Sequence, residues 1–175
     1  MEASTHLTEN ILPMVPYRQF VVSFPIPLRY WLNSNKKLYS KIHKIVICQV
    51  HRYYTDKAAR AGLKNATPGS ISFTQRWGSA CNLNPHLHIL CPDGVYFRIG
   101  ERPRFRNIES ITDEEVAELI QRIAARVLAL LKRLGYLNRD GDIVANPLAD
   151  PLFQDHQSLA EATACSISGK IAFGP

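Results

Sequence analysis

The stretch that decides the fold runs from Ser70 to Arg98 and reads SISFTQRW (70–77), GSACNLNP (78–85), HLHILC (86–91), PDG (92–94) and VYFR (95–98). Residues 70–77 alternate apolar and polar side chains, which is the period of a β-strand. Residues 86–91 predict a second strand, and residues 95–99 predict a third that pairs with it in a hairpin across the PDG turn. Side chains alternate across a strand, so His86 and His88 share one face.

Two imidazoles on one strand face suit a divalent metal ion. Gln75 falls on the preceding strand, and if the two strands pair it becomes a third ligand through its amide oxygen. Such a set favours Mg²⁺ or Mn²⁺ over a closed zinc site, and a metal held there can polarise a phosphate. The same spacing also fits a partly exposed histidine pair without a metal. The residues alone leave both interpretations open.

The segments before this stretch predict a strand and a long helix. Residues 17–24 are β-branched and aromatic and predict a buried strand, and residues 28–32 allow one or two helical turns. A helix is expected from Lys36 to Ala61, with its N-cap among residues 33–35. Its apolar stripe consists of Leu38, Ile42, Ile45, Val46, Val50 and Tyr53. Its basic residues form either a solvated face or a phosphate-facing surface; they are Lys37, Lys41, Lys44, Arg52, Lys57 and Arg60.

The segment after it predicts a second long helix. Thr112 and Glu115 have the spacing of a capping box, and Gly135 is placed to end the helix. The expected core face consists of Val116, Leu119, Ile120, Ile123, Val127, Leu130, Leu131 and Leu134. We therefore predict an α+β fold: an antiparallel sheet that carries the His-x-His strand, with two long amphipathic helices packed on one face.

Three regions are expected along the chain. Residues 1–16 form an N-terminal lead-in with a short helix at 7–12. Residues 17–137 form the core. Residues 138–175 form a C-terminal segment with a short helix at 159–168 and the start of a strand at 170–173.

The charge of the chain permits a polyanionic partner. Its 175 residues carry a formal net charge of +6. Residues 98–106 are expected to form a basic loop with interleaved Phe97 and Phe105, a composition typical of surfaces for single-stranded nucleic acid. An exposed loop without a special role explains the same residues. The candidate DNA-binding residues are Arg76, Asn82, Asn84, Arg98, Arg102, Arg104 and Arg106.

The cysteines and the hydropathy pattern favour a cytosolic protein. The four cysteines contain no Cys-x-x-Cys pair. We therefore expect no structural zinc site among them, and a reducing compartment. No apolar run reaches the roughly 18 to 20 residues of a membrane span, and the N-terminus lacks the pattern of a secretory signal.

Several blocks of the chain resemble the rolling-circle transposases of bacterial insertion sequences. These belong to the HUH-endonuclease superfamily and are also described as two-tyrosine transposases. The blocks are YRQFVVSFPIPLRY (17–30), QRWGSACNLNPHLH (75–88), DGVY (93–96) and CSISGKIAFGP (165–175). The resemblance covers nearly the whole chain from about Leu12, and its most specific part is the block at 75–88.

The resemblance implies an HUH-endonuclease-like fold that binds single-stranded DNA at an antiparallel sheet. His86 and His88 would hold a divalent cation, Mg²⁺ or Mn²⁺, and Gln75 is the position that fits a third polar ligand from the adjacent strand. In this family a tyrosine attacks the scissile phosphate and forms a 5′-phosphotyrosine intermediate, which is covalent catalysis in two transesterifications. The expected partners are single-stranded DNA at a transposon end or target, a second copy, or a full-length transposase near the nucleoid.

The chain also departs from the family's pattern. It has no cysteine-rich segment before the first strand, and after His88 its only tyrosines are Tyr96 and Tyr136, neither with a partner at helical spacing. We therefore expect a fragment that carries the metal-binding half, with its nucleophilic tyrosine elsewhere. Whether it is catalytic is open at this point. A non-catalytic nucleic-acid-binding module and an inactive remnant are the alternatives.

Overall fold

The computed structural model describes residues 12–78, 83–108 and 110–144 of the chain. Along these residues the elements follow in the order β1 (Tyr17–Ser23), α2 (Ile26–Ser34), α3 (Lys36–Arg60), β2 (Ile71–Trp77), β3 (Leu83–Pro92), β4 (Gly94–Ile99), β5 (Arg102–Asn107) and α4 (Asp113–Arg133). The fold is α+β with antiparallel sheets, as the sequence predicts. The helix expected at 159–168 and the strand expected at 170–173 lie outside the described residues, and so does the helix expected at 7–12 apart from its last residue.

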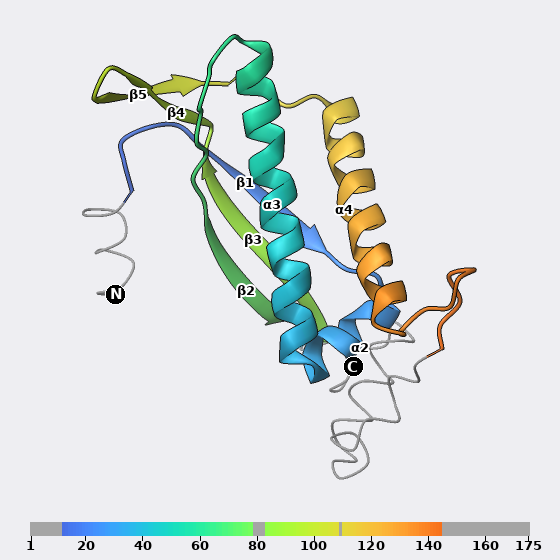
Figure 1. Ribbon diagram of the computed structural model, residues 1–175. Coiled ribbons are helices and arrows are strands. Elements are labelled where there is room, and N and C mark those ends of the chain that lie inside the picture. Colours follow the sequence, from blue (N-terminus) through green and yellow to red (C-terminus); the bar gives the residue numbers. More distant parts are fainter. Residues whose placement is uncertain (1–11, 79–82, 109, 145–175) are drawn as a thin grey trace.

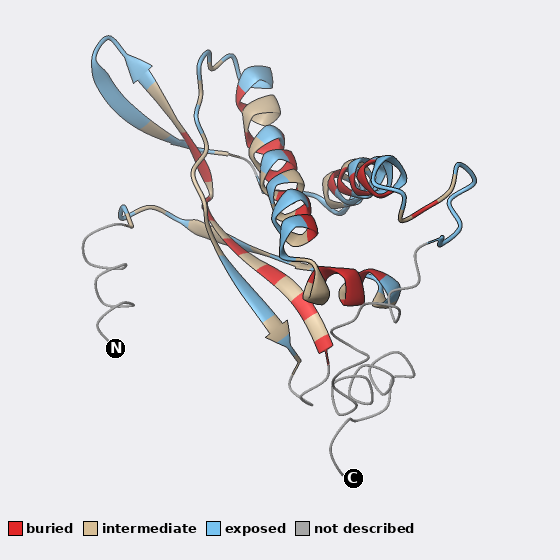
Figure 2. Ribbon diagram, turned by 60° about the horizontal axis from the view of Figure 1, so that its bottom comes forward, coloured by how far each residue is buried: buried red, intermediate tan, exposed pale blue. Residues whose placement is uncertain are grey.

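The main sheet has three antiparallel strands in the order β1-β3-β2. The long helices α3 and α4 lie side by side on one face of it (Figure 1). β3 alternates between buried and half-buried residues (Figure 2). Leu87, Ile89 and Cys91 of β3 are fully buried in the same core as the inner face of α3, whereas Leu83 belongs to a second, smaller cluster with Tyr30.

The helix α3 matches the prediction closely. Asn35 is its N-cap and accepts a hydrogen bond from the backbone N–H of Leu38 at 2.9 Å. The predicted stripe faces the core, with Ile45 half-buried at its border and the rest buried. Burial of an apolar stripe supplies most of the stability of such a helix, because helix propensity alone contributes little.

The helix α4 begins with the predicted capping box between Thr112 and Glu115. Glu115 also accepts a hydrogen bond from Lys57 of α3 at 2.8 Å, and this contact holds the pKa of Glu115 below its usual range. The predicted core face is too wide, because Ile120 is 59% exposed and Leu134 39% exposed. α4 packs mainly against α3, so only its inner side is covered.

The predicted hairpin between residues 86–91 and 95–99 is wrong. β3 is the central strand, and both of its edges are already paired, with β1 and with β2. β4 therefore leaves this sheet and pairs with β5 in a separate two-stranded sheet. The region expected as a basic loop is thus largely strand.

Two element bounds also differ from the prediction. β3 begins at Leu83, within the expected loop, because residues 83–92 pair along β1 and β2. α2 spans nine residues and buries Leu28, Tyr30, Trp31 and Leu32. Within the described ranges, no helix is long and apolar enough to cross a membrane.

Candidate functional site

The candidate site lies on the open face of the main sheet, opposite the helices. Paired residues of neighbouring antiparallel strands share a face. His86 lies between Ser23 of β1 and Gln75 of β2, and His88 lies between Val21 and Phe73. Val21 is 56% exposed and Phe73 is 50% exposed. The histidine pair is therefore flanked by accessible side chains of both edge strands.

The two imidazole rings lie next to each other, with their centroids 4.9 Å apart. Nδ1 of His86 lies 2.6 Å from the carbonyl oxygen of Asn84. A carbonyl only accepts hydrogen bonds, so Nδ1 carries the proton and Nε2 carries the lone pair. A backbone carbonyl that fixes the tautomer in this way is a common outer partner of metal-binding histidines.

His88 has a different partner. Its Nδ1 lies 2.6 Å from the amide Nε2 of Gln19 in β1. Its own Nε2 is buried and has no hydrogen-bond partner, and the same holds for Oδ1 of Asn84. A buried polar atom without a partner is costly and calls for a ligand, an ion or a water. These two orphaned atoms lie on the same strand as His86, at alternate positions.

Gln75 occupies the predicted position directly opposite His86. Its amide group, however, donates a hydrogen bond to the carbonyl of Trp77 at 3.2 Å. Gln19 is the amide that contacts the histidine pair, and this residue was not predicted from the sequence. Its position in the strand at 17–24 was clear from the sequence, but the register of that strand against β3 was not.

The other predicted DNA-binding residues are scattered. Arg76 donates to Oδ1 of Asn33 at 3.3 Å and lies over the Tyr39 ring, so it faces the helices. Asn84 lies on the face of the histidines, and Asn82 lies outside the described residues. The remaining arginines lie on the β4–β5 hairpin, away from the histidine pair; they are Arg98, Arg102, Arg104 and Arg106.

Several tyrosines make contacts that give them structural roles. Tyr136 accepts a hydrogen bond from Asn35 and packs on Trp31, and Tyr96 packs on Phe105. Burial raises the pKa of Tyr54, whose hydroxyl lies 3.4 Å from Asp93. Burial likewise raises the pKa of Tyr53 and Tyr39. A raised pKa opposes formation of a nucleophilic phenolate.

Acidic and sulfur ligands do not gather in the described part of the chain. No group of three or more His, Cys, Asp or Glu side chains in it is placed to hold a metal ion. Burial raises the pKa of the Cys91 thiol to about 12, which makes this cysteine unreactive. A metal ion on the open face would therefore depend on the two histidines and on amide oxygens.

One comparison with known proteins bears on this site. Residues 69–149 match the family described as "Putative transposase". The matched segment contains Gln75, His86 and His88, the β4–β5 hairpin and α4. The match supports a transposase role and, with it, interaction with DNA. No curated protein and no solved structure matches the chain.

Proposed function

We propose that this chain is a DNA-processing domain of a rolling-circle transposase, in which His86 and His88 hold Mg²⁺ or Mn²⁺ on the open face of the sheet and single-stranded DNA lies across that face. The observation that supports it best is the histidine pair, with the buried, unpartnered Nε2 of His88. It lies on a sheet face opposite the helices and within the segment that matches the transposase family.

The donor atoms on this face fit a divalent cation. His86 has its Nε2 lone pair free, since its Nδ1 proton is bonded to Asn84. The amide oxygens of Gln75 and Gln19 are the nearest candidates for a third, hard ligand, and either amide must turn from its present contact to serve. Two imidazoles with one oxygen leave coordination positions for a phosphate oxygen and water, and the bound metal would act as a Lewis acid.

The side chains around the histidines suit an unpaired strand. Phe73 lies directly opposite His88, and half of its surface is exposed. Exposed aromatic rings stack on bases without a sequence preference, and such stacking contributes about 1 to 3 kcal/mol per base. Phe73 therefore holds a base next to the metal while Ser23 and Gln75 offer polar contacts to the backbone.

The covalent step is not assigned to a described tyrosine. Tyr39, Tyr53, Tyr54, Tyr96 and Tyr136 make structural contacts, and for three of them burial raises the pKa. In this proposal the described part binds the metal and the strand, and the nucleophile comes from another part of the full transposase.

Single-strand binding with and without metal tests the proposal. We expect Mn²⁺ to tighten the binding of a fluorescent single-stranded oligonucleotide at least tenfold, because the metal bridges the histidines and a phosphate. His86→Ala/His88→Ala should remove this gain, whereas His51→Gln on α3 should keep it. Metal-independent binding that is the same in all three proteins would contradict the proposal and favour a non-catalytic binding module.

A further inference from the structure

The β4–β5 hairpin is an arm that projects from the body of the molecule (Figure 1). Its base is fixed at two points. Residue Thr67 forms two backbone hydrogen bonds with Tyr96, at 2.7 and 2.9 Å. Asp93, just before the arm, binds the Arg18 guanidinium through both carboxylate oxygens, at 2.9 and 2.7 Å. The arm is thus a strand pair held at a defined angle.

Gly94 makes the tight base of the arm possible. A side chain at this position would meet the carbonyl oxygen of Arg106 at 2.3 Å and the Phe105 ring at 2.6 Å. The two strands therefore approach closely where they leave the core. Val95 next to it is fully buried against the main core, which ties the arm to α3.

One face of the arm carries a row of arginines. Arg102, Arg104 and Arg106 occupy alternate positions of β5, so their side chains share a face. Two residues of a strand rise by roughly 6.8 Å, which is comparable with the step between phosphates along a nucleic-acid strand. Among the described residues, none of the three has an ion-pair partner, and the one acidic residue between Gly94 and Asn107 is Glu101.

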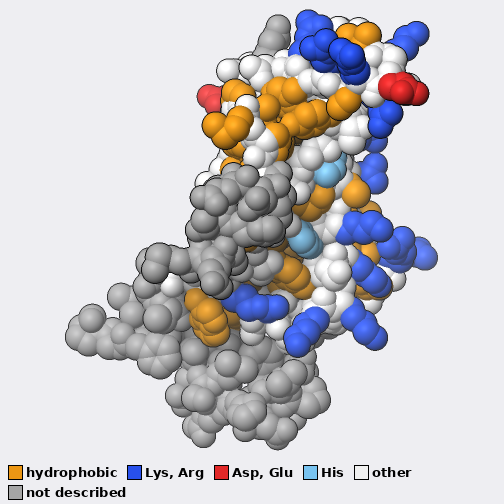
Figure 3. Space-filling view, turned by 90° about the vertical axis from the view of Figure 1, so that its left-hand side faces the viewer, with side chains coloured by type: hydrophobic (Ala, Val, Ile, Leu, Met, Phe, Trp, Pro, Cys, Tyr) orange, Lys and Arg blue, Asp and Glu red, His pale blue; other side chains and the backbone are white. Residues whose placement is uncertain are grey.

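The basic surface continues from the arm onto α3. A pocket of about 280 Å³ lies between the base of the arm and the end of α3. Arg106 and Arg60 line it, together with Asn107 and the Lys57–Glu115 ion pair. In Figure 3, Lys and Arg side chains gather at the top of the molecule, where the arm projects. Neither Arg60 nor Arg106 has a carboxylate partner among the residues that the structure describes, so this pocket is suited to an anion such as a phosphate.

Two of the three aromatic residues of the arm pack against each other, and the third, Phe97, is half-buried. The rings of Tyr96 and Phe105 pack against each other with centroids 5.0 Å apart, and both residues are half-buried. The apolar residue exposed at the tip is Ile99, at 64%. Stacking on bases needs open aromatic rings. The arm therefore offers charge for a phosphate backbone and little stacking surface for unpaired bases.

We propose that the β4–β5 hairpin binds double-stranded DNA, with Arg102, Arg104 and Arg106 on the phosphate backbone and one phosphate in the pocket at Arg60. A two-stranded ribbon has the width to enter the major groove of B-DNA. The arm's role rests on the proposed function, because the duplex would flank the single strand at His86 and His88. Gly94 lies six positions after His88, or roughly 20 Å of extended chain, so the chain would recognise a junction of duplex and single strand.

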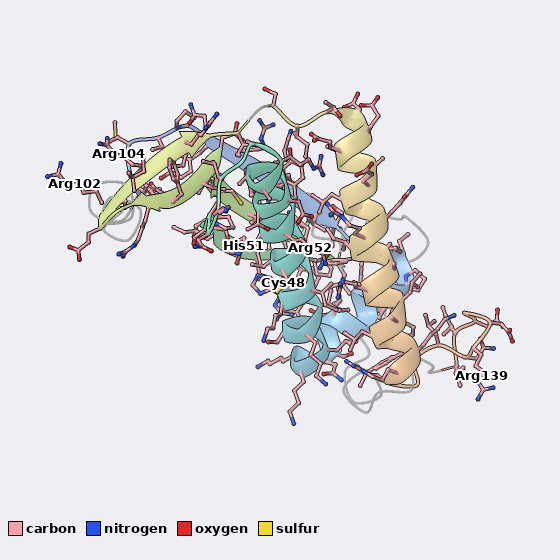
Figure 4. The ribbon with its side chains drawn as sticks, turned by 45° about the horizontal axis from the view of Figure 1, so that its top comes forward. Cys48, His51, Arg52, Arg102, Arg104 and Arg139 are labelled. Atoms are coloured by element: carbon pink, nitrogen blue, oxygen red, sulfur yellow. The ribbon has the colours of Figure 1, made fainter. Side chains whose placement is uncertain are left out.

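The test measures binding of a blunt duplex and of a single strand of equal length by fluorescence anisotropy, in EDTA and at several salt concentrations. Arg102→Gln/Arg104→Gln/Arg106→Gln should weaken duplex binding at least tenfold. It should also lower the slope of log K against log salt by roughly 2 to 3, because three phosphate contacts are lost. The matched control is Arg126→Gln/Arg133→Gln/Arg139→Gln, which removes the same charge from exposed positions on α4 and just after it. Figure 4 shows Arg139 far from Arg102 and Arg104. The control should bind duplex almost as tightly as the wild type.

Equal losses in the two triple variants would overturn the proposal, since only net charge would then matter. A loss confined to the single strand, or a loss of binding to anionic lipid vesicles with duplex binding intact, would overturn it as well. Arg102→Lys/Arg104→Lys/Arg106→Lys keeps the charge of the arm and should keep the salt dependence of duplex binding. This variant shows whether substitution at these three positions by itself disturbs the fold. Because EDTA removes the metal, these results are independent of the site at His86 and His88.

Discussion

At the scale of single residues, hydrogen-bond chemistry makes His86 and His88 different from each other. His86 is fixed by a backbone carbonyl that can only accept, so its Nε2 is available to a metal. His88 is held by the Gln19 amide, which can donate or accept depending on its rotation. In the structure the amide nitrogen faces Nδ1. If the amide turns so that its oxygen faces Nδ1, this oxygen accepts a hydrogen bond from Nδ1–H, and the buried Nε2 then carries the lone pair of a ligand.

Gln19 should therefore affect metal binding without being required for the fold. We expect Gln19→Ala to lower the affinity for Mn²⁺ about tenfold in isothermal titration calorimetry, which is the range for outer partners of metal ligands. Gln121→Ala, an exposed glutamine on α4, is the control and should bind as the wild type does. An affinity unchanged by Gln19→Ala would show that Gln19 does not orient His88.

The sequence predicted the histidine pair and the position of Gln75, because the two-residue period of a strand is local information. Gln19 and the orientation of Gln75 depend on register and on the choice of hydrogen-bond partner. Gln19 lies 69 residues from His88 along the chain. No periodic pattern links residues that far apart, so this contact was not predictable.

At the scale of elements, the contact between α3 and the edge strand β2 is polar. Hydroxyls of β2 face the helix, and its apolar side chains face the open side. Tyr39 donates to Thr74 at 2.7 Å, and Nε2 of His43 and His51 lies 2.8 Å from the hydroxyls of Ser72 and Ser70. Burial lowers the pKa of both histidines.

This contact predicts a loss of stability in mild acid. The unfolded chain takes up a proton at each histidine near pH 6.5, whereas the folded chain does so only at lower pH. The free energy of unfolding should therefore be constant above about pH 6.5 and fall as the pH drops below it. Urea titrations across pH 5 to 7.5 measure this change. His43→Gln/His51→Gln should flatten the decline of the free energy of unfolding with falling pH, and Lys44→Gln on the same helix should leave this decline unchanged. A decline that stays equally steep in the double histidine variant would contradict this assignment.

Elements with strong local signals were predicted well in type and position, but the expectation that the strand at 17–24 is buried was wrong, because β1 is an edge strand whose residues are half-buried or exposed. α3 and α4 have apolar stripes and capping residues, and β1 and β2 have β-branched or alternating patterns. β5 was missed because three of its six residues are arginines and one is a proline, a composition with weak strand propensity. Pairing with β4 makes it a strand in spite of that composition.

At the scale of the whole molecule, the helices protect one face of the sheet and leave the other accessible (Figure 1). The predicted α+β class and the packing of both long helices on one face follow from the order of elements and their apolar faces. The division into two sheets does not follow from the order of elements, because strand order is decided by pairings between distant residues. The same division separates the basic arm from the histidine face, so the two proposed DNA contacts lie on different surfaces.

The central claim is that His86 and His88 jointly bind a divalent metal, and pulsed electron paramagnetic resonance of bound Mn²⁺ tests it most directly. If both histidines bind the ion, we expect ¹⁴N modulation from two imidazoles in the wild type, from one in His86→Ala and in His88→Ala, and from none in the double variant. Bound Mn²⁺ without imidazole nitrogen coupling in the wild type, or coupling that survives in the double variant, would contradict it.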